Sequence, residues 1–134
     1  MLVVDDDPDF LYLASRFLEK VPGVKLAGVV VKGKQALPQV QALQPDIVLV
    51  DLNMPDLPGL DVISLLRAEK AQLSIIALTG IDDAQQREGA LAVGADAYVL
   101  KDNMDRDLVP SMLMAIQRHL GQQKNKLCDA FPQY

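Results

Sequence analysis

Short apolar runs alternate along the chain with longer segments in which apolar residues recur at helical spacing. The five runs are rich in Val, Ile and Leu, as expected for strands that are buried on both faces. They comprise residues 2–4, 26–31, 47–50, 75–78 and 97–100. Strands that alternate with helices predict a parallel α/β sheet with helices on both faces.

The segments between the runs predict five helices. The first begins at Pro8, with Asp7 as its N-cap, and places the apolar positions 10, 11, 14, 17, 18 and 21 on one stripe. The other four helices are expected over residues 34–43, 59–70, 83–93 and 106–120. Pro38 falls in the interior of the second, where a proline should kink or shorten a helix.

Composition narrows the class of protein. A length of 134 residues suits one domain with a hydrophobic core, here residues 1–120, followed by a tail or linker over residues 121–134. A net charge of −5 argues against nucleic acid as the main partner. The single cysteine, and the absence of a signal peptide or membrane-length apolar run, lead us to expect a cytoplasmic location.

Polar residues stand where the predicted strands end. Asp5 and Asp6 follow the first strand, Asp51 the third, Thr79 the fourth and Lys101 the fifth. In an open parallel sheet these ends meet at one edge, and ligands bind there. The sequence therefore predicts three carboxylates, a hydroxyl and an ammonium group in one crevice.

This set of groups suggests phosphoryl chemistry. Three adjacent carboxylates repel one another, and a hard divalent ion such as Mg²⁺ relieves that repulsion. One carboxylate could act as nucleophile toward phosphorus, while Lys101 and Thr79 supply a positive charge and a hydrogen bond to the phosphoryl oxygens. Each residue also has a simpler interpretation: Asp51 could cap a loop, and Thr79 and Lys101 could be ordinary strand-end residues. Their joint occurrence favours the phosphoryl site.

Four stretches give the chain a family resemblance. In order, they are "LVVDDDP", "PDIVLVDLNMPDLPGLDVI", "IIALTG" and "GADAYVLK". Together they resemble the response regulator receiver domain of two-component signalling, as in chemotaxis-type receivers, over residues 2 to about 120. The resemblance implies a flavodoxin-like (βα)5 fold, a three-layer sandwich with strand order 2-1-3-4-5.

The resemblance also implies the site's roles. Asp51 matches the phosphoacceptor. Asp6 matches the direct metal ligand, Asp5 a ligand acting largely through water, and Asn53 the position whose backbone carbonyl completes a Mg²⁺ (or Mn²⁺) site. Pro55 and Gly59 match the loop after the acceptor.

Further positions match the switch of the family. Thr79 and Lys101 correspond to the switch hydroxyl and the site lysine, and Tyr98 to the switch aromatic. By resemblance, the domain is a phosphoacceptor and not a turnover enzyme. Phosphorylation would change the surface formed by the fourth helix, fifth strand and fifth helix, through which a dimer is also conceivable.

The resemblance also suggests the partners. These are a histidine kinase or phosphotransfer protein as donor and an effector domain or protein downstream. No membrane and no direct contact with nucleic acid by this domain is expected.

Two residues depart from the family pattern. Asp102 follows Lys101 where the family usually has proline, so we expect no cis peptide bond there. Ile81, two residues after Thr79, occupies a position that tunes the phosphoryl lifetime, and its apolar side chain cannot orient a hydrolytic water.

His119 is interpreted as a surface residue, so the phosphoryl group should come from another protein or from a further domain. Met114 falls off the stripe that we expect to dock the last helix, which comprises residues 108, 109, 112, 113, 116 and 120.

Four rival interpretations fit the sequence less well. A nucleotide-binding domain needs a glycine-rich turn after the first strand, where this chain has "DDDPD". An aspartate-nucleophile phosphatase needs a second carboxylate where Asn53 stands. A flavodoxin-type electron carrier would want a hydroxyl-rich phosphate loop and aromatic residues around the flavin, and this chain has no Trp. The fourth is a receiver-like interaction module that is not phosphorylated, against which the complete set of site residues argues.

Overall fold

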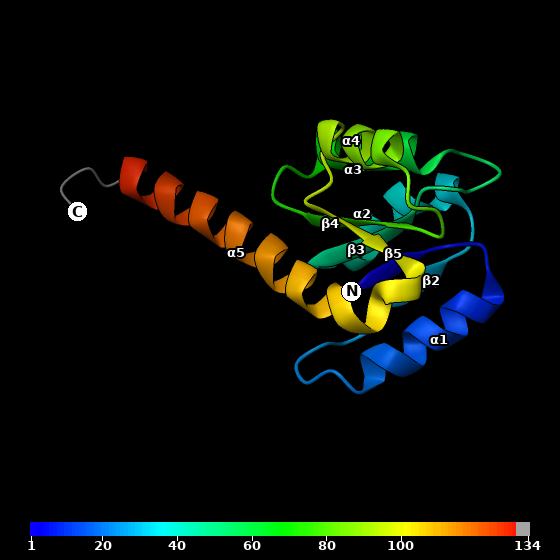
Figure 1. Cartoon of the computed structure of the whole chain (residues 1–134). Coiled ribbons are helices and arrows are strands. Elements are labelled where there is room, and N and C mark those ends of the chain that lie inside the picture. Colours follow the sequence, from blue (N-terminus) through cyan, green and yellow to red (C-terminus); the bar gives the residue numbers. More distant parts are fainter. Residues whose placement is uncertain (131–134) are drawn as a thin grey trace.

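Five parallel strands form one sheet in the computed structural model, and helices cover both of its faces (Figure 1). The strands are β1 (Leu2–Val4), β2 (Gly28–Val30), β3 (Ile47–Asp51), β4 (Ser74–Thr79) and β5 (Ala97–Leu100). Their order in the sheet is β2-β1-β3-β4-β5, which confirms the predicted fold class. The structure describes the backbone of residues 1–130 and the side chains of residues 1–120.

The helices follow the strands in strict alternation. They are α1 (Pro8–Glu19), α2 (Ala36–Leu43), α3 (Gly59–Glu69), α4 (Ala84–Ala92) and α5 (Met104–Ala130). Two short 3-10 helices, η1 (Gly33–Gln35) and η2 (Lys101–Asn103), precede α2 and α5. Each helix in the described part of the chain is too short or too polar to span a bilayer.

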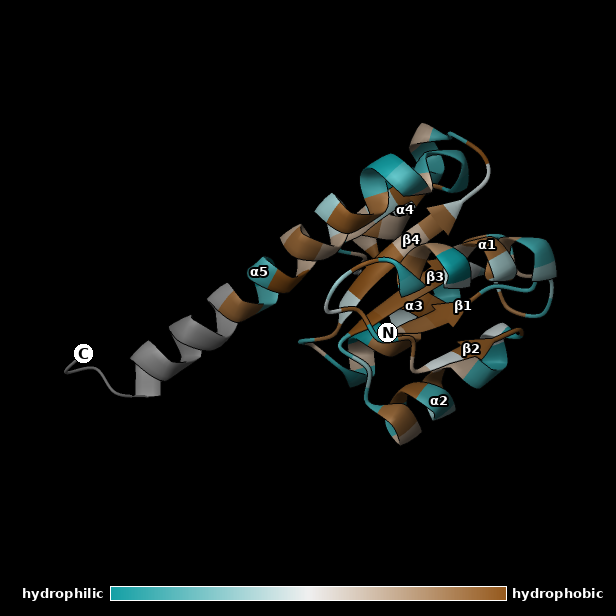
Figure 2. Cartoon of the chain, turned by 90° about the horizontal axis from the view of Figure 1, so that it is seen from below, coloured by the Kyte–Doolittle hydropathy of each residue, from teal (hydrophilic) through white to brown (hydrophobic). Residues whose placement is uncertain are grey.

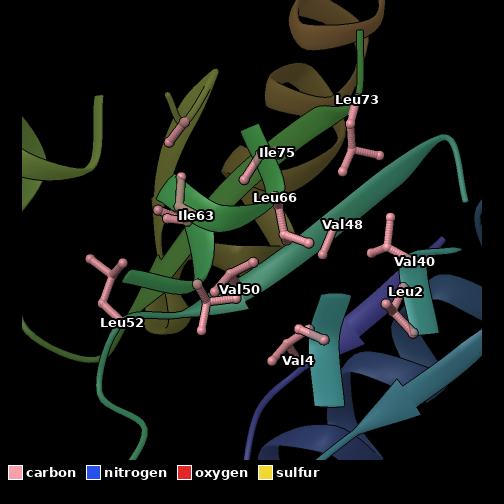
Figure 3. Packing of buried hydrophobic residues seen from close by; sticks show 14 of the residues in the cluster. Leu2, Val4, Val40, Val48, Val50, Leu52, Ile63, Leu66, Leu73 and Ile75 are labelled. Atoms are coloured by element: carbon pink, nitrogen blue, oxygen red, sulfur yellow. The ribbon is translucent and has the colours of Figure 1, made fainter. Parts of the chain in front are cut away.

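The core consists of two apolar layers, one on each face of the sheet. Helices α1 and α5 cover one face, and α2, α3 and α4 cover the other (Figures 1 and 2). Val48 and Val50 point toward the face that α3 covers with Ile63 and Leu66 (Figure 3). Ile47 and Leu49 point toward α1 and α5. The strand interiors are therefore apolar, apart from the hydroxyl group of Tyr98 on β5, as the continuous apolar runs predict.

The start of α1 forms as predicted. Asp7 is the N-cap, and its Oδ1 accepts a hydrogen bond from the backbone N–H of Asp9 at 3.0 Å. Pro8 occupies the first helical position, where its missing N–H costs nothing. Helix α1 therefore begins directly after the acidic residues that follow β1.

Two predicted elements differ from the structure for local reasons. Strand β2 is shorter than residues 26–31, because it pairs only with the three residues of β1. Of the two effects predicted for Pro38, the second helix is shortened, from residues 34–43 to Ala36–Leu43. After η1, helix α2 begins at Ala36, so Pro38 lies in its first turn, where a backbone N–H has no partner within the helix.

The last helix is longer than predicted, and a different stripe docks it. Helix α5 continues past Gly121 to Ala130, because one glycine costs only about 1 kcal/mol and residues 122–130 contain no proline. The predicted docking stripe is partly wrong, since Leu113 and Leu120 are about half exposed. Within residues 104–120, whose side chains the structure describes, α5 buries Leu108, Met112, Ala115 and His119. Met114 is exposed, as expected for a residue off the stripe.

Candidate functional site

The carboxyl edge of the sheet gathers the polar residues that the sequence singled out. Asp5 follows β1, Asp51 is the last residue of β3, Thr79 is the last of β4, and Lys101 follows β5. Asp5, Asp51 and Thr79 are buried, with at most 3% of their surface exposed. Charged and polar groups are thus held at the end of an otherwise apolar sheet, where desolvation strengthens their interactions.

Lys101 holds the two buried carboxylates together. Its Nζ lies 2.6 Å from Asp5 Oδ2 and 3.5 Å from Asp51 Oδ2. The same ammonium lies 4.5 Å from the ring centroid of Phe10, on the first turn of α1. Carboxylates at the ends of two strands and an aromatic face therefore fix the position of this cation.

Backbone N–H groups contact the other oxygen of each carboxylate. The N–H of Asp7 donates to Asp5 Oδ1 at 2.8 Å, and the N–H of Asn53 donates to Asp51 Oδ1 at 3.1 Å. These bonds leave Oδ2 of Asp51 directed at Lys101. The loops after β1 and β3 thereby orient the acids at their strand ends.

Burial dominates the electrostatics of Asp51. It raises the pKa of the carboxyl, and the negative charge of Asp5 raises it further, while the Asn53 N–H and Lys101 oppose the rise. For Lys101, burial alone would lower the pKa, but the hydrogen bond to Asp5 and the charge of Asp51 outweigh it, so the pKa is raised. The lysine therefore stays cationic.

Three carboxylates lie close enough to share one cation. Ligand oxygens of Asp5, Asp6 and Asp51 all lie within 4.8 Å of one another, the first and last buried and Asp6 exposed. Carboxylate oxygens are the ligands that hard divalent cations prefer, and Mg²⁺ commonly keeps several waters, which the exposed side of the cluster allows. The residues at this edge therefore fit a magnesium site.

Gly59 allows the loop after Asp51 to close tightly. A Cβ at Gly59 would lie 2.4 Å from the Asp51 carbonyl oxygen and 2.4 Å from Leu52 Cα, closer than any side chain permits. The N–H of Gly59 donates to the Leu52 carbonyl at 3.2 Å. Helix α3 can start against the end of β3 because this residue has no side chain. Pro55 is an exposed residue of the same loop.

Thr79 and Tyr98 contact the same loop residue, Ile81. The Ile81 N–H donates to Thr79 Oγ1 at 3.2 Å, and the Tyr98 hydroxyl donates to the Ile81 carbonyl at 3.0 Å. The Arg87 guanidinium lies 5.2 Å from the centroid of the Tyr98 ring. The Ile81 side chain itself is 60% exposed.

One neighbour of the site escaped prediction from the sequence. Thr79 Oγ1 donates to Gln86 Oε1 at 3.2 Å, and Gln86 Nε2 donates to Asn53 Oδ1 at 3.5 Å. Gln86 is one of two adjacent glutamines at the start of α4. Which of the two glutamines faces Thr79 depends on the position of the helix to within one residue. The sequence pattern does not define a helix start that closely, so it could not distinguish Gln86 from Gln85.

A second buried polar cluster lies at the opposite edge of the sheet and corrects the prediction for His119. This residue is only 6% exposed, and its Nε2 lies 3.0 Å from both carboxylate oxygens of Asp96. Asp96 also accepts hydrogen bonds from Arg67 Nη2 at 3.0 Å and from the Ile75 N–H at 2.8 Å. Because Asp96 precedes β5 and Lys101 follows it, the cluster is remote from the acidic site.

The segment after Lys101 agrees with the expectation drawn from Asp102. No peptide bond in the described residues is cis. Lys101 opens the 3-10 helix η2, which leads directly into α5. The lysine is therefore positioned by β5 before it and by a helical turn after it.

Comparisons with known proteins agree with this fold. The family model described as "Response regulator receiver domain" matches residues 1–113. The nitrate/nitrite response regulator protein NarL of Escherichia coli is 30% identical over 86% of this chain and 53% of its own length. The DNA-binding response regulator MtrA of Mycolicibacterium smegmatis is 37% identical over 89% of this chain and 51% of its own.

Solved structures show the same architecture. The signal receiver domain of a modulated diguanylate cyclase from Desulfovibrio desulfuricans G20 has a TM-score of 0.80 at 29% identity, and covers 90% of this chain and 95% of its own. A CheY-like receiver domain protein from Methanospirillum hungatei JF-1 has a TM-score of 0.80 at 23% identity with the same coverage, a likeness of fold alone.

The fold and the acidic edge thus define a receiver of the two-component type. The chain belongs to the response regulator receiver domain family. Phosphoryl transfer to an aspartate is the general function of that family, and its members pair with histidine kinases and effector domains. The chain spans about half the length of the curated relatives it matches.

Proposed function

We propose that this domain accepts a phosphoryl group on Asp51 and uses it as a signal. The position of the Asp51 carboxylate carries the proposal. It is buried at the end of β3, beside Asp5, and Lys101 Nζ lies 3.5 Å from its Oδ2. A carboxylate in this setting can act as a nucleophile, and the acyl phosphate that it forms would lie beside the ammonium group of Lys101.

The donor in this proposal is the phosphohistidine of a histidine kinase or of a phosphotransfer protein. One Asp51 oxygen forms a bond to phosphorus as the bond between phosphorus and the imidazole nitrogen breaks, and the imidazole leaves with that electron pair. Lys101 places its positive charge near the phosphoryl oxygens, and Thr79 supplies a hydrogen bond. The chain's own contribution is positioning and charge neutralisation.

A divalent cation completes the proposed site. The carboxylates of Asp5, Asp6 and Asp51 and the backbone carbonyl of Asn53 would hold Mg²⁺ or Mn²⁺. When bound, the ion neutralises charge on the carboxylates and on the phosphoryl oxygens. Asp6 is exposed, whereas Asp5 is buried against Lys101, which supports Asp6 as the direct ligand and Asp5 as a ligand acting through water.

The phosphoryl group then acts as a switch. Thr79 would move toward it, and Tyr98, now tied to the loop after β4 through Ile81, would turn inward. The surface formed by α4, β5 and α5 would change with it and present itself to an effector or to a second copy of the chain. In this role the domain is phosphorylated once per signal and does not turn over a substrate, and the apolar Ile81 gives no help in hydrolysis.

The proposal is tested with the small donor acetyl phosphate. Wild-type protein should gain one phosphoryl group when Mg²⁺ is present and none when it is removed by a chelator, as measured by intact mass. Asp51→Asn should abolish the gain, whereas Asp61→Asn on the exposed face of α3 should not. Wild-type protein that gains no phosphoryl group would contradict the proposal and favour the alternative of an interaction module that is not phosphorylated.

A further inference from the structure

The hydroxyl group of Thr79 has its only proton committed to Gln86. Thr79 is fully buried, and its Oγ1 donates to Gln86 Oε1 at 3.2 Å. The same oxygen accepts from the Ile81 N–H at 3.2 Å and from Asn53 Nδ2 at 3.4 Å. A hydroxyl has one proton and two lone pairs, so these three bonds satisfy it completely.

Gln86 closes a ring of three side chains. Its Nε2 donates to Asn53 Oδ1 at 3.5 Å, so that Asn53, Thr79 and Gln86 are joined pairwise. Asn53 stands two residues after Asp51, and its own N–H donates to the Asp51 carboxylate. The ring therefore lies beside the proposed acceptor and connects it to the first turn of α4.

The ring and the signalling role of Thr79 exclude one another. In the proposed switch, Thr79 donates its proton to an oxygen of the phosphoryl group on Asp51. The proton cannot serve both acceptors, so that contact requires the bond to Gln86 to break. We propose that Gln86 is a positioning residue that locks Thr79 in its resting orientation, its carboxamide oxygen competing with the phosphoryl group for the Thr79 proton.

The position of Gln86 links this lock to the surface of the domain. It is the third residue of α4, a helix in which only Ala90 is buried. With so small an apolar contact, the polar bonds of its first turn form a substantial part of what holds α4 in place. Release of Thr79 would loosen this turn. The turn belongs to the surface formed by α4, β5 and α5, which is proposed to change on phosphorylation.

A quantitative expectation follows for a phosphoryl mimic. This inference rests on the proposed function, because it concerns the contact between Thr79 and the phosphoryl group. A lock that stabilises the resting state lowers the fraction of molecules competent to bind the mimic, and so weakens the apparent affinity. Loss of one net hydrogen bond should therefore tighten binding by about 2- to 10-fold.

The test uses beryllofluoride with Mg²⁺ and measures affinity from amide NMR shifts. Gln86→Leu, which keeps the size of the side chain and removes its hydrogen bonds, should bind more tightly than wild type by the expected factor. Gln85→Leu, at the exposed neighbouring position, should bind as wild type does. Gln86→Glu retains an acceptor for Thr79 and adds negative charge, so it should bind no more tightly than wild type.

A double-mutant cycle separates a lock on Thr79 from a general effect on α4. In a Thr79→Ala background there is no hydroxyl to lock, so Gln86→Leu should leave the affinity unchanged. If Gln86→Leu tightens binding equally in the wild-type and Thr79→Ala backgrounds, the inference is overturned. It is also overturned if Gln86→Leu and Gln85→Leu both bind the mimic with the same affinity. If wild-type protein does not bind beryllofluoride at all, the proposed function fails, and this inference fails with it.

Discussion

Thr79 and Tyr98 are linked through the backbone of a single residue. Thr79 Oγ1 accepts from the Ile81 N–H, and the Tyr98 hydroxyl donates to the Ile81 carbonyl 3.0 Å away. Because one peptide segment contacts both side chains, a movement of Thr79 toward Asp51 must disturb the segment that holds Tyr98. This arrangement gives a physical path from the acidic edge to the outer surface of β5.

Thr79→Ala should separate phosphorylation from the surface response. The substitution leaves Asp51 and the acidic cluster intact, so the protein should still bind beryllofluoride, but the amide shifts around Tyr98 should lose most of their response. Ser64→Ala, which removes an exposed hydroxyl on α3, provides the control and should respond as wild type does. If Thr79→Ala shows wild-type shifts around Tyr98, the proposed coupling through Thr79 is wrong.

Magnesium should stabilise the fold, because it relieves repulsion among Asp5, Asp6 and Asp51. Asp6→Ala should remove most of the Mg²⁺-dependent rise in melting temperature. Asp7→Ala removes the N-cap of α1 and should cost about 1 kcal/mol of stability, yet keep the Mg²⁺-dependent rise. Thermal unfolding of the three proteins across a Mg²⁺ titration checks this, and equal loss in both variants would contradict the assignment of roles.

The cluster around Asp96 should matter for stability and not for phosphorylation. Asp96→Ala leaves Arg67 and His119 without their buried acceptor and should destabilise the fold by about 3 kcal/mol. Urea unfolding measures the loss. The folded variant should accept a phosphoryl group from acetyl phosphate at the wild-type rate, because the cluster lies at the other edge of the sheet. A slower rate in folded protein would show that the two edges are coupled.

Acid should weaken the contact between the loop after β3 and η1. Asp56 accepts hydrogen bonds from the N–H groups of Gly33 at 3.0 Å and Lys34 at 3.1 Å, and these bonds lower the pKa of its carboxyl. A lowered pKa means that this stabilisation is present above the ordinary aspartate range, near pH 4, and is lost as the pH falls through the lower value of the folded state.

The corresponding experiment compares Asp56→Asn with wild type. The variant should be less stable at neutral pH, and the difference in melting temperature should shrink as the pH falls from about 5 to about 2. Glu88→Gln, at an exposed position of α4, should behave as wild type at neutral pH. A difference that stays constant across this range would contradict the role of the Asp56 charge.

The sheet and its acidic edge could be predicted because they depend on local pattern and topology. Strands buried on both faces must be apolar throughout, which allowed β1, β3 and β4 to be predicted from the sequence. The edge strand β5 is half-buried on one face and is also an apolar run. Parallel strands place their carboxyl ends at one edge, so Asp5, Asp51 and Lys101 had to approach one another. The ion pairs of Lys101 with both acids follow from that topology.

The features that were missed depend on helix phase and helix ends. His119 belongs to the stripe of α5 that faces the sheet, and a rotation of the predicted docking face by one position moves it from the surface into the core. The second helix was predicted to start two residues too early, because η1 precedes α2. A shift of α4 by one residue would place Gln85, and not Gln86, beside Thr79. Such shifts lie within the ordinary uncertainty of helix boundaries in a sequence.

The most direct measurement of the central claim locates the phosphoryl group in the chain. Protein treated with acetyl phosphate and Mg²⁺ is reduced with borohydride, which converts an aspartyl phosphate into homoserine, and the modified residue is identified by tandem mass spectrometry. The account predicts homoserine at position 51 alone, and none without Mg²⁺. Homoserine at Asp5 or Asp6, or modification of Asp51→Asn protein at the wild-type rate, would contradict the assignment of Asp51 as the acceptor.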